Sequence, residues 1–371
     1  MRVLHVTTFL QGGAGRNITD LAVAQLRAGL DVLVVADRGG EPGYSSYQEY
    51  IDEMHAAGVP FSTITSTFKR DDALNRRGAS ELQELIEGWP PDLVHAHAAT
   101  PAVVARRAGL GIDQPVLHTM HGWGVAKTQE QSAADIAVLE RASAVVVPSA
   151  AAAHTLKRAG LMRQDVQVIP YGIPGHASAM APDAEDVRRV RRSAGDRPVL
   201  LCVGTIGERK NQRLLVDVLA AGLDDVVAVF VGDGEAAALE AHARRAAVGD
   251  RVVVLGHRPH ASRYLALAAA AVLPSRNEGL PLFVLESLRA GVPVVASNIP
   301  EIAEAVGEHG YLFAPDDAGA LAAALRSALR ATAGQRAALR ARFESRYSST
   351  TMFAAYSRLY EQLTTVTVVS L

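Results

Sequence analysis

The sequence predicts an α/β protein with two domains, each a parallel sheet covered by helices. Short apolar segments typical of buried strands alternate with helical segments along nearly the whole chain, and this alternation occurs twice. The 371 residues are too many for one typical core. Apolar residues make up 49% of the chain and aromatic residues only 5%, a balance that suits Ala, Val and Leu helices packed on buried parallel strands.

The composition narrows the functional class. The net charge of −2 gives no basic field that would favour nucleic acid, so no nucleic-acid partner is expected. A single cysteine, Cys202, excludes a disulfide framework within the chain and suits a reducing compartment. The N-terminus predicts a short strand rather than a signal peptide, and the longest apolar run, 265–273, falls far short of the roughly 20 residues of a spanning helix. We expect a soluble cytoplasmic protein, with peripheral contact at the inner face of the cell membrane left open.

The first half reads as a βαβ opening followed by further alternating elements. We expect strands at 3–9, 32–36, 61–64, 91–97, 116–120, 144–147 and 166–169, and helices from the first turn to Ala28 and at 49–58, 80–87 (with Ser80 as its cap), 131–141 and 150–158. The Ala-, Gly-, Pro- and Ser-rich segment 175–184 predicts a linker.

The first turn is glycine-rich and includes Gly12 and Gly13. Its GGAG sequence lacks the spacing of a dinucleotide-binding GxGxxG turn. Two interpretations remain at this point: the glycines bring the backbone close to a ligand, or they make a tight turn needed only for packing.

Histidines follow two of the predicted strands. His95 and His97 lie two residues apart, hence on one face of a strand, but no cluster of Cys, Asp or Glu completes a metal set around them. Hydrogen-bonded histidines at a strand end are therefore favoured. His118 is expected inside its strand. His121 follows the carboxyl end of that strand, where ligands bind in open α/β sheets, and is the best-placed histidine of this half.

The second half repeats the alternation. We expect strands at 199–203, 227–231, 252–255, 271–273 and 294–296, helices at 212–221, 235–246, 262–269, 282–290 and 302–306, and a helical tail over 316–363. The tail ends in an apolar stripe, interpreted as core packing, of Met352, Phe353, Tyr356, Leu359, Tyr360 and Leu363. The four arginines within 186–193 are interpreted as a solvated helix face rather than an anionic-lipid patch.

Two cations, Arg209 and Lys210, follow a glycine-containing turn at the end of strand 199–203. Arginine offers a bidentate fork and lysine a mobile point charge, so the pair can bind an anion. A helix N-terminus disfavours cations, because the helix dipole is positive there, and this favours a functional role over simple surface charge.

The segment 274–306 combines a loop with a helix start. Glu278 and Glu286 stand with seven residues between them, and Gly279 and Pro281 follow the first. Proline at a first helical position loses an amide that has no helical partner, and the remaining free amides and the helix dipole favour an anion. The two acids span at most about 12 Å if helical, which leaves room for a diphosphate and a polar group on either side.

These motifs occur in the order found in a known family. They are GGAG at 12–15, PDLVHAH at 91–97, HTMHG at 118–122, VIPYGI at 168–173, VGTIGERKN at 203–211, VGDGE at 231–235, NEGLPLFVLES at 277–287 and GVPVVASNIPEIAE at 291–304. Together they resemble the retaining glycosyltransferases of the family-4 (group 1) type. The resemblance implies the GT-B fold, with two Rossmann-like domains facing a cleft: an acceptor-side domain at 1–175, a nucleotide-sugar-binding domain at 176–350, and a C-terminal helix at 351–371 that returns to the first domain.

The resemblance also implies roles for individual residues. Arg209 and Lys210 would hold the donor diphosphate and offset charge on the leaving nucleotide. Glu286 would hold the ribose hydroxyls, Glu278 would contact the transferred sugar, and His121 would reach that sugar from the first domain. The resemblance implies further donor-site positions. Gly12 and Gly13 would lie near phosphate and acceptor, and the backbone turn at Arg258 would lie near the base. The remaining positions are Thr205 and, around the phosphate, the amides of Gly279, Leu280 and Leu282.

The implied reaction is transfer of a hexose from a UDP- or GDP-sugar to a glycan or lipid-linked acceptor, with retention and without a metal or other cofactor, in cell-envelope polysaccharide, lipopolysaccharide or glycolipid synthesis. A nonhydrolysing nucleotide-sugar epimerase and a nucleotide-sugar-binding module without turnover are the alternatives. Acceptor recognition is expected in the loops at 39–48 and 66–78, the second of which is basic.

Three positions depart from the family pattern. Thr205 stands where many members have arginine, so Arg209 and Lys210 would carry more of the phosphate binding. Arg16 stands where many carry glutamate. The segment 171–174 replaces a common Asn-Gly hinge sequence, which leaves the hinge contacts of the family without a counterpart here.

Overall fold

The computed structural model describes residues 1–40, 44–124, 127–175 and 181–369. The predicted loop at 39–48 and linker at 175–184 therefore lie partly outside the described residues. The chain forms two compact units: unit 1 comprises Met1–Ile173 and Ser349–Leu371, and unit 2 comprises Pro174–Ser348. Among the described residues, every helix is too short or too polar to cross a lipid bilayer.

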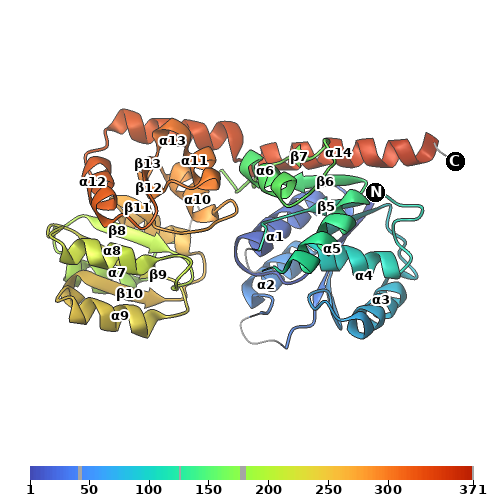
Figure 1. Cartoon of the computed structure of the whole chain (residues 1–371), viewed down its shortest axis with the longest axis horizontal. Coiled ribbons are helices and arrows are strands. Elements are labelled where there is room, and N and C mark those ends of the chain that lie inside the picture. The colour runs from blue at the N-terminus through green and yellow to red at the C-terminus, as the bar shows by residue number, and fades with distance from the viewer. Residues whose placement is uncertain (41–43, 125–126, 176–180, 370–371) are drawn as a thin grey trace. The chain divides into compact units, whose positions relative to one another are not determined.

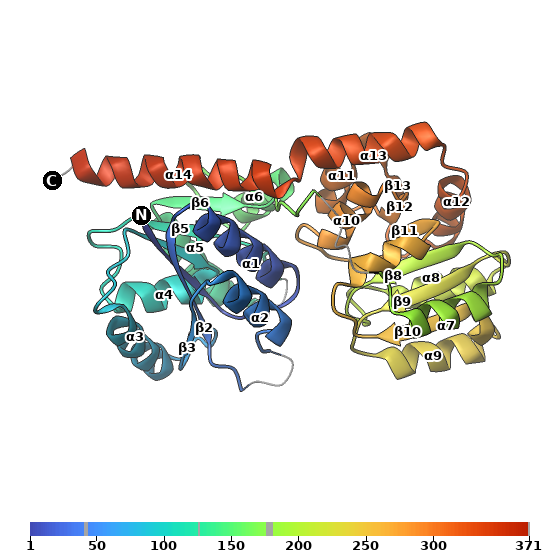
Figure 2. The same ribbon diagram turned by 180° about the vertical axis from the view of Figure 1, so that it is seen from behind.

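Unit 1 is a seven-stranded parallel sheet in the order β3-β2-β1-β4-β5-β6-β7, with helices on both faces (Figures 1 and 2). Its strands are β1 (Arg2–Thr7), β2 (Asp31–Asp37), β3 (Phe61–Ile64), β4 (Leu93–His97), β5 (Val116–Thr119), β6 (Ala144–Val147) and β7 (Gln167–Val168). Its helices are α1 (Gly12–Arg27), α2 (Gln48–Ala57), α3 (Asp72–Ile86), α4 (Ala99–Arg107), α5 (Gln129–Glu140), α6 (Ala150–Arg158) and α14 (Ser349–Val369).

Side-chain alternation assigns each face of this sheet to a different set of helices. On β1, Leu4 and Val6 pack in the cluster that contains α3 and α4, whereas Val3 packs in the cluster that contains α1 and α14. Since neighbouring residues of a strand point to opposite faces, His5 shares the face of Val3. The predicted return of the last helix to the first domain is confirmed, because α14 belongs to unit 1 and contacts α1.

Unit 2 is a six-stranded parallel sheet in the order β10-β9-β8-β11-β12-β13. Its strands are β8 (Val199–Val203), β9 (Val227–Val231), β10 (Val252–Gly256), β11 (Ala270–Leu273), β12 (Val294–Ser297) and β13 (Tyr311–Phe313). Its helices are α7 (Ala184–Ala194), α8 (Gln212–Ala220), α9 (Ala236–Arg245), α10 (Leu282–Ala290), α11 (Pro300–Val306), α12 (Ala318–Ala328) and α13 (Ala333–Arg346), with 3-10 helices η1 (Gly249–Arg251), η2 (Ala261–Leu267) and η3 (Gly307–His309).

Each sheet has a point where the strand order reverses, between β1 and β4 in unit 1 and between β8 and β11 in unit 2. At such a point the connections leave toward opposite sides, which opens a crevice beyond the carboxyl ends of the two strands. The fold thus places the loops after β1, β4, β8 and β11 where ligands bind in α/β sheets. The predicted α/β fold with two Rossmann-like halves is confirmed.

Several local predictions were wrong. Ser80 lies inside α3, which begins at Asp72; the cap is Asp71, whose carboxylate accepts a hydrogen bond from the Leu74 amide at 2.8 Å. Helix α4 was missed because Pro101 in its first turn resembles a helix-breaking residue. The helix expected at 262–269 is the 3-10 helix η2. Strand β13 was missed because it is only three residues long. The helical tail divides into three helices, α12, α13 and α14.

Candidate functional site

Two loops of unit 2 meet at the reversal point of its sheet. Residues 204–211 follow β8 and residues 274–281 follow β11, and these two strands are hydrogen-bonded neighbours. The amide of Arg276 donates to the carbonyl of Arg209 at 2.9 Å, and the Arg209 guanidinium donates to the carbonyl of Asn277 at 3.0 Å. One main-chain bond and one bond from a side chain to the main chain therefore fix one loop against the other.

The predicted residues Arg209, Lys210 and Glu278 come together at this point. Lys210 Nζ donates to Glu278 Oε1 at 2.5 Å, and Arg209 Nη1 lies 3.4 Å from Glu278 Oε2. The carboxylate is buried, whereas the Arg209 side chain is 55% exposed. A buried carboxylate is stable only when it is paired, and here two cations share it, so the cluster keeps one positive charge in excess. That excess charge is available to an anion.

Glycine is required beside the lysine. Gly204 has φ +140°, and a Cβ at this position would lie 3.2 Å from Lys210 Cε. The missing side chain therefore leaves room for the lysine stem. Cys202, at the end of β8, is buried, and burial raises the pKa of its thiol to about 12, so the thiol is not a nucleophile at neutral pH.

Three residues that the sequence did not single out brace the cluster. Asn211 adopts the left-handed conformation at φ 54° and donates to Asp316 Oδ1 at 2.9 Å, and Arg276 Nε donates to the same oxygen at 2.9 Å. Asparagine tolerates this conformation better than most residues, so an asparagine after two cations was the one available signal. Arg276 and Asp316 stand 40 positions apart, and only the fold shows that they meet.

The start of α10 supplies main-chain donors next to Glu278. The structure puts Pro281 at the N-cap rather than at the first helical position, and α10 begins at Leu282. The first amides of a helix have no intrahelical acceptor, and the helix dipole makes this end positive. Leu280 is buried and Gly279 is half-buried. Glu286 lies further along α10, half-buried and in contact with other groups.

Arg258 and Thr205 have different surroundings. The Arg258 guanidinium makes a bidentate pair with Asp186, with distances of 2.7 and 3.0 Å, and this hydrogen bond holds the pKa of Asp186 below its usual range. The same guanidinium donates to the main-chain carbonyl of His257 at 2.9 Å, so the arginine side chain is bonded both to α7 and to its own turn. Thr205 is exposed at the end of β8.

In unit 1 the glycines of the first turn differ in role: one is needed for packing, and another leaves space where a ligand could approach the backbone. Gly12, the first residue of α1, has φ +55° and is exposed, and a Cβ added there would meet nothing within 4 Å. Gly13 is half-buried. A Cβ on Gly15, in contrast, would lie 2.4 Å from the carbonyl carbon of Leu10. Gly15 is needed for packing, whereas Gly12 needs only its backbone conformation and leaves open space.

His121 follows β5, and both of its ring nitrogens are hydrogen-bonded within unit 1. Nε2 lies 3.0 Å from His97 Nδ1, and Nδ1 lies 2.8 Å from the Tyr171 hydroxyl. Burial lowers the pKa of His121 to about 3. At neutral pH the ring is therefore uncharged and carries one proton.

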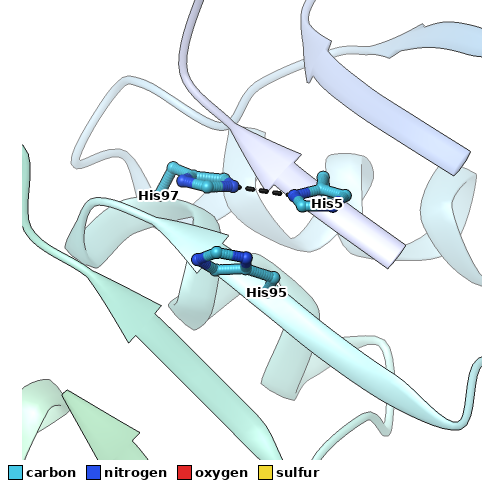
Figure 3. Close-up of side chains that lie close together, drawn as sticks. All are labelled: His5, His95 and His97. Carbon is cyan, nitrogen blue, oxygen red and sulfur yellow. Dashed lines mark hydrogen bonds between the residues drawn. The ribbon is translucent and has the colours of Figure 1, made fainter. Parts of the chain in front are cut away.

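His5, His95 and His97 form a buried cluster at the reversal point between β1 and β4 (Figure 3). Their ligand atoms lie within 4.8 Å of one another, as a metal site requires, and His5 was not foreseen because it joins the others only across the sheet. Hydrogen bonds, however, occupy these nitrogens. His5 Nδ1 lies 2.9 Å from His97 Nε2, and His95 contacts Tyr360 at 2.6 Å and Thr119 at 2.7 Å. The prediction of hydrogen-bonded histidines is confirmed.

The segment 66–78, predicted as a basic loop, includes the first turns of α3, and its arginines pair with carboxylates. Arg70 pairs with Asp135 at 2.7 Å, Arg76 pairs with Asp72 in the preceding helical turn, and Arg77 lies 3.3 Å from Glu81. Lys69 also has a contact. Each of these carboxylates also pairs with a second cation, namely Lys127, Arg107 and Arg38, so the pairing does not neutralise the region. Acceptor recognition in this segment stays a prediction.

The departure at Arg16 has a structural explanation. Its guanidinium pairs with Asp20 at 2.5 Å and with Glu53 at 2.6 Å, and it lies 5.1 Å from the centre of the Tyr50 ring. Arg16 therefore joins α1 to α2, and its charge is used within unit 1. At the hinge departure, Tyr171 is the partner of His121, and burial raises the pKa of its hydroxyl.

Comparison with known proteins agrees with this architecture. Residues 197–331 match the family model of the group 1 glycosyl transferases, and residues 11–174 match that of glycosyltransferase family 4. The glycogen synthase of Mycobacterium tuberculosis is 30% identical over 366 residues, covering 87% of this chain and 84% of that protein. TuaC of Bacillus subtilis, named for teichuronic acid biosynthesis, is 31% identical over 245 residues, which span 62% of this chain and 60% of that protein.

A crystal structure of Anabaena Alr3699/HepE in complex with UDP and glucose superposes with a TM-score of 0.81 and 20% identity, over 98% of this chain and 100% of that one. Fold and matches together define a glycosyltransferase with the GT-B fold. The chain belongs to the group 1 glycosyltransferase family, as its motifs indicate.

Proposed function

We propose that this glycosyltransferase moves a hexose from a UDP- or GDP-sugar to a glycan or lipid-linked acceptor, with retention of the anomeric configuration and without a divalent metal. The observation that carries the proposal is the cluster of Arg209, Lys210 and Glu278 at the reversal point of the unit 2 sheet, next to the start of α10. Its excess positive charge and the free amides of the helix suit a diphosphate.

The charge of the cluster suggests how the donor binds. Lys210 Nζ donates to Glu278 Oε1 at 2.5 Å. A diphosphate oxygen would take over that ammonium and the exposed Arg209 guanidinium, and the Glu278 carboxylate would then be free to accept a hydrogen bond from a hydroxyl of the transferred sugar. Glu286 is assigned to the ribose hydroxyls, because a carboxylate accepts bonds from both members of a diol.

In the proposed reaction the bond between the anomeric carbon and the phosphate oxygen breaks, and its electron pair leaves with the nucleoside diphosphate. The acceptor oxygen forms its bond on the same face of the sugar, and its proton passes to the leaving phosphate oxygen. Arg209, Lys210 and the amides of Gly279, Leu280 and Leu282 stabilise the negative charge that develops on that phosphate, which is electrostatic catalysis by preorganised donors. This charge stabilisation is why no metal is required in the proposal.

The remaining assignments are part of the same proposal. His121 contacts the transferred sugar, Gly12 and Gly13 lie near phosphate and acceptor, and Thr205 and the backbone of the turn at Arg258 contact the donor. The relatives support the choice of substrate: Alr3699/HepE was solved with UDP and glucose, and TuaC is named for teichuronic acid biosynthesis. A lipid-linked acceptor would bring the reaction to the inner face of the cell membrane.

A donor panel tests the proposal. The protein is incubated with UDP- and GDP-hexoses and a set of glycan and lipid-linked acceptors, with and without a chelator, and products are identified by mass spectrometry. Free nucleotide together with a glycosylated product, insensitive to the chelator, supports it. A changed sugar on an intact nucleotide indicates an epimerase, and binding of donor with no product from any acceptor indicates a binding module; either result contradicts the proposal.

A further inference from the structure

A continuous chain of hydrogen bonds runs through the buried layer between the unit 1 sheet and helices α1 and α14. One branch joins His121 to Gln25 of α1, and the other joins Gln25 to Tyr356 of α14. The first branch is Tyr171 to His121 (2.8 Å), His121 to His97 (3.0 Å), His97 to His5 (2.9 Å) and His5 to Gln25 (2.7 Å). The second is Gln25 to Tyr360 (2.9 Å), Tyr360 to His95 (2.6 Å), His95 to Thr119 (2.7 Å) and Thr119 to Tyr356 (3.1 Å).

Gln25 determines which atom donates and which accepts in every hydrogen bond of the first branch. An uncharged imidazole donates from one nitrogen and accepts at the other, whereas an amide nitrogen only donates and an amide oxygen only accepts. Gln25 Oε1 faces His5 Nε2, so that nitrogen carries the proton and Nδ1 accepts from His97 Nε2. By the same reasoning His97 Nδ1 accepts from His121 Nε2, and His121 Nδ1 accepts from the Tyr171 hydroxyl.

The second branch obeys the same rule. Gln25 Nε2 donates to the Tyr360 oxygen, so the Tyr360 proton goes to His95 Nδ1, and His95 Nε2 then donates to Thr119. Every link therefore has one donor and one acceptor when all four histidines are uncharged. Burial lowers the pKa of His5 to about 4 and the pKa values of His95 and His97 well below the usual value, which keeps them uncharged at neutral pH.

We infer that Gln25 is a positioning residue that fixes the proton of His121 on Nε2 through His97 and His5, and so leaves His121 Nδ1 as a hydrogen-bond acceptor. With the amide reversed, every proton in this branch would move to the other nitrogen and His121 Nδ1 would become a donor. The catalytic consequence rests on the proposed function: a sugar hydroxyl that replaces the Tyr171 hydroxyl would find an acceptor on His121.

A packing role alone does not explain this glutamine. Gln25 is 1% exposed, on the helix face that packs against the sheet, and burying an amide among apolar groups is costly unless its hydrogen bonds are satisfied.

A metal ion is the other alternative. A metal bound by His5, His95 and His97 would have to displace the 2.9 Å bond between His5 and His97 and one of the hydroxyl contacts of His95. The cluster holds three uncharged rings and no carboxylate, so a cation there would be buried without an opposing charge.

The test is nuclear magnetic resonance of the full chain with 15N-labelled histidine, since the chemical shifts of the two ring nitrogens report which one is protonated. In the wild-type protein at neutral pH, we expect His5, His95, His97 and His121 all to be uncharged with the proton on Nε2. A wild-type His121 that carries its proton on Nδ1, or that averages between the two forms, overturns the inference whatever the variants do.

Gln25→Met keeps the length of the side chain and removes both polar atoms. His5 Nε2 then loses its acceptor, and a buried N–H without a partner is more costly than an unprotonated nitrogen, so the protons of His5, His97 and His121 should shift toward Nδ1. Tyr356→Phe removes a buried hydroxyl from the far end of the other branch and serves as the matched control, with His121 unchanged. An unchanged His121 in a folded Gln25→Met protein contradicts the inference.

The activity measurement separates this inference from the proposed function. If transfer occurs, Gln25→Met should lower kcat at least about fivefold, while the affinity for UDP or GDP stays within twofold, because the nucleotide is assigned to unit 2. If no donor is used by the wild-type protein, the proposed function fails and the tautomer result still stands. If transfer is measured and the tautomers do not follow Gln25, the inference alone fails.

Discussion

Replacement of Lys210 by methionine removes the ammonium and keeps most of the apolar stem beside Gly204. In the proposed site this ammonium makes a charge-assisted hydrogen bond to the donor diphosphate, and such a bond contributes about 1.5–3 kcal/mol. Since about 1.4 kcal/mol corresponds to a factor of ten in rate, kcat/KM should fall about 10- to 150-fold. The assay is initial-rate release of nucleotide from the donor that the panel identifies.

The variant also leaves the buried Glu278 with Arg209, at 3.4 Å, as its remaining cationic partner in the cluster. Unit 2 should therefore lose about 1–3 kcal/mol of unfolding free energy, measured by chemical denaturation. The double variant Lys210→Met, Glu278→Gln should recover stability without recovering activity. Lys157→Met, the same change on an exposed position of α6, is the control. An unchanged kcat/KM in folded Lys210→Met would refute the assignment of Lys210 to the diphosphate.

Three further predictions concern the same sites. Glu286→Gln should weaken UDP or GDP binding about tenfold in calorimetry, because about 1.4 kcal/mol of binding free energy to the ribose is lost. Equal affinity of the variant and the wild-type protein would contradict the assignment of Glu286 to the ribose. Gly204→Ala should reduce donor affinity and destabilise unit 2 by about 1–3 kcal/mol, because φ +140° is strained for alanine and its Cβ would crowd Lys210. A variant with the donor affinity and melting temperature of the wild-type protein would show that Lys210 does not need a glycine beside it. Unit 1 should lose stability as the pH falls from 6.5 toward 4, because the unfolded chain protonates His5 at about 6.5 and the folded protein only near 4. Each such histidine contributes up to about 1.4 kcal/mol per pH unit, and a stability that is flat across this range in denaturant titrations argues against buried uncharged histidines.

The fold was largely predictable because its information is local and repeated. Strands such as β4 and β8 are short apolar runs, and their alternation with helical segments fixes a parallel sheet. Two elements were missed: α4, whose first turn contains Pro101, and β13, which is too short to show a period. Asp71 caps α3 in place of Ser80 because the helix begins eight residues earlier than its apolar pattern indicated.

The candidate site was predictable only in part. Arg209 and Lys210 were predicted because cations are unfavourable at a helix start, and Glu278 because of its spacing from Glu286 and the family resemblance; the structure brings the three together. The groups that brace them, such as Asp316, lie far away in sequence and look like ordinary surface residues.

The hydrogen-bonded histidines of unit 1 were likewise predictable only in part, because some of their partners are distant in sequence. His95 and His97 share a strand, and their spacing was readable in the sequence. His5 and Gln25 join them only because β1 pairs with β4 and α1 packs on that face of the sheet. Tyr356 and Tyr360 were correctly assigned to the core, since they pack in it, but their hydroxyl groups also serve the hydrogen-bond chain.

We propose that a nucleotide sugar is the donor and that side-chain cations and helix amides, without a metal, support retaining transfer. It is tested most directly by the anomeric configuration of the product, determined by nuclear magnetic resonance after reaction in the presence of a chelator. We expect a glycoside with the configuration of the donor, formed at the rate seen without chelator. A product of inverted configuration, or a reaction that stops when divalent ions are removed, would contradict it.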